Sequence, residues 1–214
     1  MIKAVIFDLD GVLVHTDKFH YLAWKALADK LGVYFDETIN NRCRGVSRME
    51  SLDIVLERSD KTYTQEEKVA FATEKNEIYK SYLATMKPND VTDDVKNTVL
   101  SLKNRGIKVA IGSSSKNTRF ILERVGLIDL FDAISDGNNI SHSKPDPEVF
   151  LKAAEFLGIE PCYCMIVEDA VSGVEAGKRA GMTTTAIGDA AIAHIADNDI
   201  EKLSDILDIV KQAR

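Results

Sequence analysis

Short runs of apolar residues recur along the chain and end in polar residues. Lys3–Leu9 forms the first run, and Ile107–Gly112 and Cys164–Val167 repeat the pattern. A continuous apolar run of this length is typical of a strand buried on both faces, as in parallel sheets. Shorter β-like stretches cover Phe131–Ser135 and Thr183–Ile187. The pattern therefore predicts a parallel sheet built from these segments.

Segments with helical periodicity lie between the predicted strands. Asp93–Arg105 carries apolar residues at three- and four-residue spacing, and Thr118–Val125 and Pro147–Leu157 show the same pattern. Strands that alternate with helices form βαβ units, in which the sheet is parallel. We therefore expect an α/β fold with a Rossmann-like parallel sheet core.

The alternation is interrupted between residues 15 and 87. Periodic apolar positions run through Phe19–Leu31, Ser47–Glu57 and Gln65–Tyr82, and no strand pattern is evident there. This arrangement predicts an inserted helical cap domain, residues 15–87. The α/β catalytic core would then consist of the two flanking segments, residues 1–14 and 88–214.

Composition narrows the class of protein. The 214 residues carry a formal net charge of -7, which argues against a nucleic-acid partner because phosphate backbones attract dense Lys and Arg faces. No run approaches the roughly 20 apolar residues that span a bilayer, so we expect no membrane partner. Three cysteines, two of which are separated by a single residue, fit neither a disulfide framework nor the usual zinc spacings. We expect a cytoplasmic protein and a monomer.

Two carboxylates and a run of hydroxyls follow the first two strands. Asp8 and Asp10 are two residues apart, so an extended chain directs both toward one site, and their like charges then require a cation or a proton. Ser113, Ser114 and Ser115 precede a predicted helix, where hydroxyls and helix N–H groups suit a phosphate. An ordinary serine helix cap is the alternative.

Later strands end in charged residues as well. Lys144 precedes Pro145, which stiffens its loop, and the lysine is a candidate phosphate clamp or else a surface lysine before a helix. Glu168 and Asp169 are adjacent carboxylates at a strand end, and oxygen ligands near a phosphate favour Mg²⁺. In doubly wound sheets, ligands bind beyond the carboxyl ends of the strands, so these groups should converge.

In this order, the motifs resemble the four signature motifs of the haloacid dehalogenase-like superfamily, and the resemblance covers the whole chain. They are Asp8-Leu9-Asp10-Gly11, Ser113, Lys144-Pro145 and Glu168-Asp169. The cap is similar to that of the β-phosphoglucomutase family within this superfamily. The similar cap features are His20, Ala23-Trp24, Gly45-Val46-Ser47-Arg48, Ser51-Leu52 and Lys75-Asn76, and Ser115-Lys116-Asn117 resembles that family's substrate loop.

The resemblance implies phosphoryl transfer through an aspartyl-phosphate. Asp8 would be the nucleophile and Asp10 the general acid and base, while Ser113 and Lys144 would hold the transferring group. Mg²⁺ would be held by Asp8, the backbone carbonyl of Asp10, Glu168 and Asp169.

The resemblance also implies a set of substrate-binding residues for a small sugar phosphate. Arg48 would bind the phosphate that is not transferred, and His20 would position Asp10. A structural histidine, a packing tryptophan and a solvated lysine are the alternatives at His20, Trp24 and Lys75. The full expected set is Gly45, Val46, Arg48, Ser51, Trp24, Lys75, Ser114, Ser115, Lys116 and Asn117.

Three functions follow from the resemblance and stay open at this point. The first is an isomerase that converts β-glucose 1-phosphate to glucose 6-phosphate through glucose 1,6-bisphosphate. The second is a phosphatase of the same superfamily, and the third is a non-catalytic sugar-phosphate binder, which intact Asp8 and Asp10 argue against. His15 departs from the family, which usually has an acidic residue here, and this puts cap motion or its pH dependence in doubt.

Overall fold

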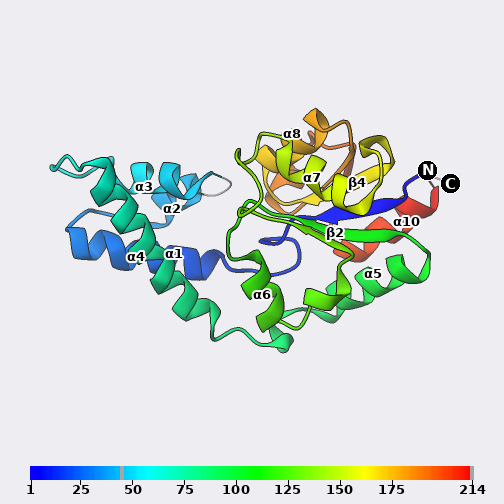
Figure 1. The fold of residues 1–214 in the computed structure, drawn as a ribbon, viewed down its shortest axis with the longest axis horizontal. Coiled ribbons are helices and arrows are strands. Elements are labelled where there is room, and N and C mark those ends of the chain that lie inside the picture. Colours follow the sequence, from blue (N-terminus) through cyan, green and yellow to red (C-terminus); the bar gives the residue numbers. More distant parts are fainter. Residues whose placement is uncertain (44–45, 213–214) are drawn as a thin grey trace. The chain divides into compact units, whose positions relative to one another are not determined.

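The computed structural model describes residues 1–43 and 46–212, and its backbone divides into two compact units (Figure 1). Residues 1–15 and 87–214 form one, which we call the core unit, and residues 16–86 form the other, the helical unit. The boundaries predicted from the sequence lie within one residue of this division. The roles assigned to the two parts stay predictions.

The core unit is built on a parallel sheet that has six strands among the residues described. Their spatial order is β3-β2-β1-β4-β5-β6, which confirms the predicted α/β fold with a parallel core. Phe7 pairs with both Ile111 and Val167, so the segments after β1, β2 and β4 begin at one edge of the sheet. The strands are β1 (Ala4–Phe7), β2 (Lys108–Gly112), β3 (Ala133–Ser135), β4 (Cys164–Glu168), β5 (Thr183–Ile187) and β6 (Asn198–Ile200).

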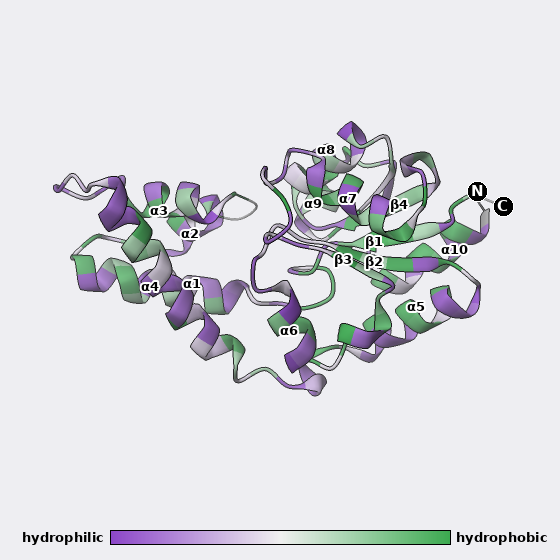
Figure 2. Cartoon of the chain, viewed as in Figure 1, coloured by the Kyte–Doolittle hydropathy of each residue, from purple (hydrophilic) through white to green (hydrophobic). Residues whose placement is uncertain are grey.

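Helices cover both faces of this sheet (Figure 1). The helices α7 and α8 pack on one face, and α5 and α10 lie on the other. Ile6 and Phe150 are fully buried between β1 and α7, and Figure 2 shows the apolar character of the central strands. The helices of the core unit are α5 (Asp93–Asn104), α6 (Thr118–Arg124), α7 (Glu148–Leu157), α8 (Val171–Arg179), α9 (Asp189–Ile192) and α10 (Ile206–Gln212).

The helical unit contains α1 (Asp17–Leu31), α2 (Glu37–Arg42), α3 (Arg48–Leu56) and α4 (Gln65–Leu83). It has its own apolar core, in which Trp24 and Leu52 are almost completely buried. Ser47 and Thr64 form capping boxes that start α3 and α4, because each hydroxyl accepts from a backbone N–H three residues later. In the part of the chain that the structure describes, no helix has the length and apolarity to cross a membrane.

The strand β6 and the helix α2 are among the elements that were not predicted from the sequence. The strand β6 has the sequence NDI and stands last in the strand order, next to β5, so its polar residues reflect an edge position. The helix α2 spans six residues and begins where the Asp36 carboxylate accepts from Ile39 N at 2.9 Å. A helix this short has too few turns to show a periodic apolar pattern.

Candidate active site

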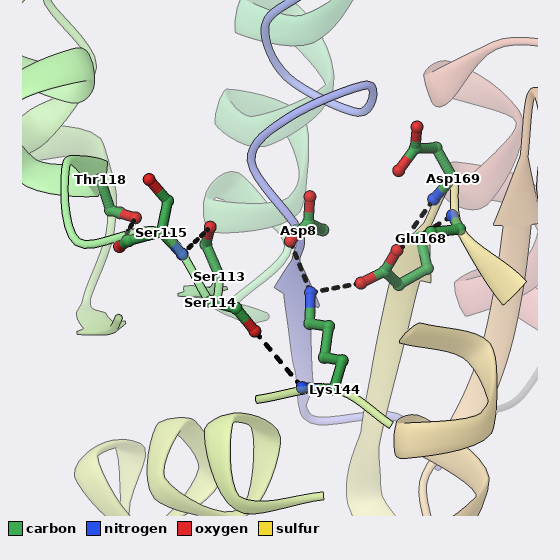
Figure 3. Close-up of polar contacts among 9 residues, drawn as sticks. Asp8, Ser113, Ser114, Ser115, Thr118, Lys144, Glu168 and Asp169 are labelled. Carbon is green, nitrogen blue, oxygen red and sulfur yellow. Dashed lines mark hydrogen bonds and ion pairs between the residues drawn. The ribbon is translucent and has the colours of Figure 1, made fainter. Parts of the chain in front are cut away.

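Three charged side chains from separate segments meet at the carboxyl edge of the sheet. Asp8 directly follows β1, Glu168 ends β4, and Lys144 comes from the loop before α7. Lys144 Nζ donates to Asp8 Oδ1 at 2.5 Å and also to Glu168 Oε1 (Figure 3). Relative exposures of 7%, 8% and 1% for Asp8, Lys144 and Glu168 show that these charges are paired largely out of water.

Burial and charge act in opposite directions on this triad. Burial lowers the pKa of Lys144, but the carboxylates of Asp8 and Glu168 outweigh it, so the net shift is upward. Burial raises the pKa of Glu168 to about 8, with Asp8 adding to the rise and Lys144 opposing it. Lys144 therefore stays a cation, while Glu168 readily takes up a proton.

A hard metal ion fits the same group of carboxylates. Ligand oxygens of Asp8, Glu168 and Asp169 all lie within 4.8 Å of one another. A set of oxygen ligands alone suits Mg²⁺ or Ca²⁺ rather than metals that prefer sulfur or nitrogen. Burial is the largest cause of the raised pKa of Glu168, and the nearby Asp8 carboxylate adds to it. These residues therefore fit a divalent cation.

Two glycines make room for the carboxylates. A Cβ atom at Gly11 would collide with the Asp169 carboxylate, and one at Gly173 would collide with that of Glu168. Gly11 also has a φ of +81°, a conformation that other residues rarely adopt. Glu168 Oε2 accepts from Asp169 N at 3.1 Å, which holds the carboxylate in place (Figure 3).

Asp10 lies two residues beyond Asp8, in the turn that leaves β1. Its side chain is half-buried, and its backbone forms an isolated bridge with Val14. Gly11 N donates to Val14 O at 2.7 Å and closes this turn. Local backbone contacts therefore hold Asp10 close to Asp8, the candidate nucleophile.

The segment Ser113–Asn117, which we call the serine loop, follows β2. Ser113 Oγ accepts from Ser115 N at 3.3 Å, and Thr118 Oγ1 donates to Ser115 O at 2.8 Å (Figure 3). Ser114 Oγ accepts from Lys144 N at 3.5 Å, which connects the serine loop to the loop that carries Lys144. Of the predicted residues here, Ser113 and Asn117 are buried, Ser114 and Ser115 are half-buried, and Lys116 is exposed.

In the helical unit, the structure brings His20, Trp24 and Lys75 together. Lys75 is 3% exposed, and its Nζ lies 2.9 Å from His20 Nδ1 and 4.5 Å from the Trp24 ring centroid. Burial, followed by the charges of Lys75 and Arg48, holds the pKa of His20 well below its usual value of 6.5. His20 is therefore neutral at pH 7 and accepts the hydrogen bond from Lys75.

Other predicted residues of the helical unit lie around the start of α3. Arg48 is its first residue and is half-buried, and burial lowers the pKa of its guanidinium. Ser51 is buried and donates to Cys43 O at 3.2 Å, whereas Val46 is 38% exposed. Gly45 lies outside the residues that the structure describes.

Sequence reasoning missed one carboxylate at the same edge of the core sheet. Asp136 follows β3 directly and is only 2% exposed. Its position after a predicted strand was the available signal, since Asp8 and Glu168 were found in that way. Asp136 begins a turn that contacts the serine loop through Gly137 N, which donates to Ser115 O at 3.1 Å.

Comparison with known proteins adds a family to this geometry. A family model for haloacid dehalogenase-like hydrolases matches residues 2–181. A β-phosphoglucomutase of Bacillus subtilis is 39% identical over 206 residues, which cover 95% of this chain and 91% of the relative. A phosphorylated-carbohydrates phosphatase of Thermotoga maritima is 34% identical over 184 residues, or 84% of this chain and 82% of that one.

A solved structure resembles the whole fold. The crystal structure of a β-phosphoglucomutase from Clostridium difficile superposes with a TM-score of 0.92 at 36% identity. The match covers 99% of this chain and 96% of that one. The similarity therefore extends over both units and is not confined to the motifs.

Proposed function

The chain belongs to the haloacid dehalogenase-like hydrolases, and on that premise we propose that it transfers a phosphoryl group of a sugar phosphate through a phosphoaspartate on Asp8. The observation that carries this proposal is the position of the Asp8 carboxylate. It accepts a hydrogen bond from buried Lys144 and lies beside Glu168 and Asp169. A carboxylate nucleophile divides one difficult substitution into two easier ones.

The proposed cofactor is Mg²⁺, held by Asp8, the Asp10 backbone carbonyl, Glu168 and Asp169. When bound, it would supply positive charge to the oxygens of the transferring phosphoryl group. Lys144 supplies a second positive charge, and its pairing with Asp8 and Glu168 holds its ammonium group in a fixed place.

The proposed reaction has two steps. First, an Asp8 oxygen forms a bond to phosphorus while the phosphorus–oxygen bond of the ester breaks, and Asp10 gives its proton to the leaving oxygen. Second, a hydroxyl oxygen attacks the phosphoaspartate, Asp10 takes the proton of that hydroxyl, and Asp8 is released as a carboxylate. Ser113 donates a hydrogen bond to the transferring group in both steps.

Among the possible acceptors we favour a sugar hydroxyl, which makes the protein an isomerase of β-glucose 1-phosphate and glucose 6-phosphate with a bisphosphate intermediate. The similarity to two β-phosphoglucomutases over nearly the whole chain supports this choice. Such an enzyme must hold a phosphate at both ends of its intermediate, and Arg48 is our candidate for the end that does not react. A guanidinium suits a phosphate because it donates two parallel hydrogen bonds.

A sugar-phosphate phosphatase is the second candidate. It is favoured by the 34% identity to the Thermotoga maritima phosphatase, which shows that comparable similarity occurs with hydrolytic relatives. The two candidates share every step at Asp8 and differ only in whether a sugar hydroxyl or water accepts the phosphoryl group.

One assay separates the two candidates. Purified protein is incubated with Mg²⁺, β-glucose 1-phosphate and a trace of glucose 1,6-bisphosphate, and glucose 6-phosphate and free phosphate are measured together. Glucose 6-phosphate in large excess over phosphate supports the isomerase. Phosphate as the main product moves the protein to the phosphatases. If a broad panel of sugar phosphates yields neither product, the proposal is overturned.

A further inference from the structure

The turn after β3, residues 136–139, contacts the serine loop mainly through the loop's carbonyl groups. We call this segment the bracing turn. Gly137 N donates to Ser115 O at 3.1 Å, and Asn138 Nδ2 donates to Lys116 O at 3.1 Å. Two successive carbonyls of the serine loop are thus bound by two successive residues of one neighbouring segment.

Gly137 allows this close approach. A Cβ atom at this position would collide with Ser114 O and would lie 2.9 Å from Lys116 N. Both are backbone atoms of the serine loop, so the collision cannot be relieved by rotating a side chain. The φ of Gly137 lies outside the left-handed region, and the need for glycine here is therefore steric.

The bracing turn is itself held firmly. Asp136 is buried, and its Oδ1 accepts from Asn138 N at 2.9 Å. Asn139 N donates to Asp136 O at 3.0 Å, and Asn139 Nδ2 donates to Ser135 Oγ at 3.2 Å. Arg119 Nε lies 3.6 Å from Asp136 Oδ2, which is an ion-pair distance without a hydrogen bond. A turn with this many internal contacts can transmit the position of β3 to the serine loop.

We propose that the bracing turn positions the serine loop for the part of the substrate that is not transferred, with Gly137 and Asn138 as positioning residues. This inference rests on the proposed function. The phosphoryl end of the site is held differently, since Ser113 N donates to Ser135 O at 3.1 Å as a continuation of the β2–β3 pairing. Loss of the bracing contacts therefore affects binding of the part of the substrate that is not transferred, at Ser115 to Asn117, more than binding of the transferring phosphoryl group at Ser113.

The test compares Asn138→Asp with wild type. This change is nearly isosteric and replaces the Nδ2 donor with a carboxylate oxygen, which repels the Lys116 carbonyl. Asn89→Asp is the matched control, because Asn89 is also exposed and lies in the same unit outside both segments. We expect KM for β-glucose 1-phosphate to rise about three- to tenfold, the range of one lost hydrogen bond, with kcat little changed. Gly137→Ala should act in the same direction and more strongly.

Two further readouts separate positioning from general damage. Formation of the phosphoenzyme from acetyl phosphate, which has no sugar, should stay within twofold of wild type in Asn138→Asp. Amide hydrogen exchange of residues 113–118 should rise in Asn138→Asp and not in Asn89→Asp. Unchanged KM, unchanged exchange, or equal losses with both phosphoryl donors would overturn the inference. If wild type turns over no sugar phosphate, the proposed function fails and the assigned role in substrate binding fails with it. The hydrogen-exchange data still decide whether the bracing turn holds the serine loop.

Discussion

Removing the charge of Lys144 should strongly destabilise the metal-free protein. Lys144→Met keeps the length and the apolar stem of the side chain and deletes the ammonium group. In the wild type, that group donates to Asp8 and Glu168, which are 7% and 1% exposed. The variant would leave two buried carboxylates close together with their shared cation gone.

The size of the effect follows from the burial of the partners. Breaking a buried ion pair by removing one member costs about 3–5 kcal/mol, because the remaining charge is buried without compensation. Protonation limits this cost, since the pKa of Glu168 is already about 8 with Lys144 present and rises further when Lys144 is lost. Glu168 is then neutral at pH 7, so we expect a loss near the lower limit, about 3 kcal/mol. That is a large part of the roughly 5–15 kcal/mol that stabilises a typical domain.

Urea unfolding followed by far-ultraviolet circular dichroism measures this loss at pH 7 in a chelator. The control is Lys80→Met, because Lys80 pairs with Glu77 on the surface, where the two side chains are 45% and 63% exposed. Exposed pairs contribute about 0–1 kcal/mol, so the control should change little. Saturating Mg²⁺ should return part of the lost stability to Lys144→Met, since a ligand present at a hundredfold excess over its dissociation constant stabilises by about 2.7 kcal/mol. A chelated Lys144→Met protein within 1 kcal/mol of wild type would refute the reasoning.

Three other changes test separate parts of the site. Asp8→Asn should lower turnover by at least about a thousandfold and abolish acid-stable incorporation of labelled phosphate, and residual phosphoenzyme would remove Asp8 as the nucleophile. Burial and the charges of Lys75 and Arg48 lower the pKa of His20 in the folded protein. Below pH 6.5, the His20 imidazole therefore gains a proton when the protein unfolds. The contribution of His20 to the free energy of unfolding is therefore complete above pH 6.5 and declines as the pH falls. His20→Gln keeps an acceptor for Lys75 but does not titrate, so urea unfolding of this variant at several pH values should show a smaller decline. Arg48→Ala should reduce isomerase activity far more than hydrolysis of a small phosphate ester, while Arg58→Ala should affect neither, and equal losses on both substrates would exclude Arg48 as the distal phosphate ligand.

Local patterns in the sequence were enough to predict the strands that carry the core site. Ala4–Phe7 and Cys164–Val167 are continuous apolar runs because every residue of these strands is buried. Charged residues at the ends of these strands interrupt an otherwise apolar pattern, so Asp8 and Glu168 could be singled out before their contacts were known. The parallel register then brings them to one edge, as the rule for doubly wound sheets implies.

The contacts of the bracing turn could not be predicted in the same way. Its sequence, Asp136 to Asn139, contains only ordinary turn residues. Its proximity to the serine loop depends on the pairing of Gly112 with Ser135, which is a tertiary register between strands more than 20 residues apart in the chain. The steric requirement at Gly137 likewise exists only once Ser114 O has been placed against it. Sequence periodicity carries no information on such contacts.

The charge balance of the core site connects its stability with its proposed chemistry. Asp8, Glu168 and Asp169 bring three negative charges when ionised, and Lys144 brings one positive charge, so the group holds an excess equal to the charge of one divalent cation. Without a cation, burial and Asp8 raise the pKa of Glu168 to about 8, and a proton on Glu168 then relieves part of this excess. Binding of the proposed Mg²⁺ must displace that proton, because the ligand is the carboxylate form. The excess of negative charge that makes the metal-free site costly is therefore what suits it to a divalent cation. With that cation bound, the cation and Lys144 together would provide the positive charge that the proposed transfer of a phosphoryl dianion requires.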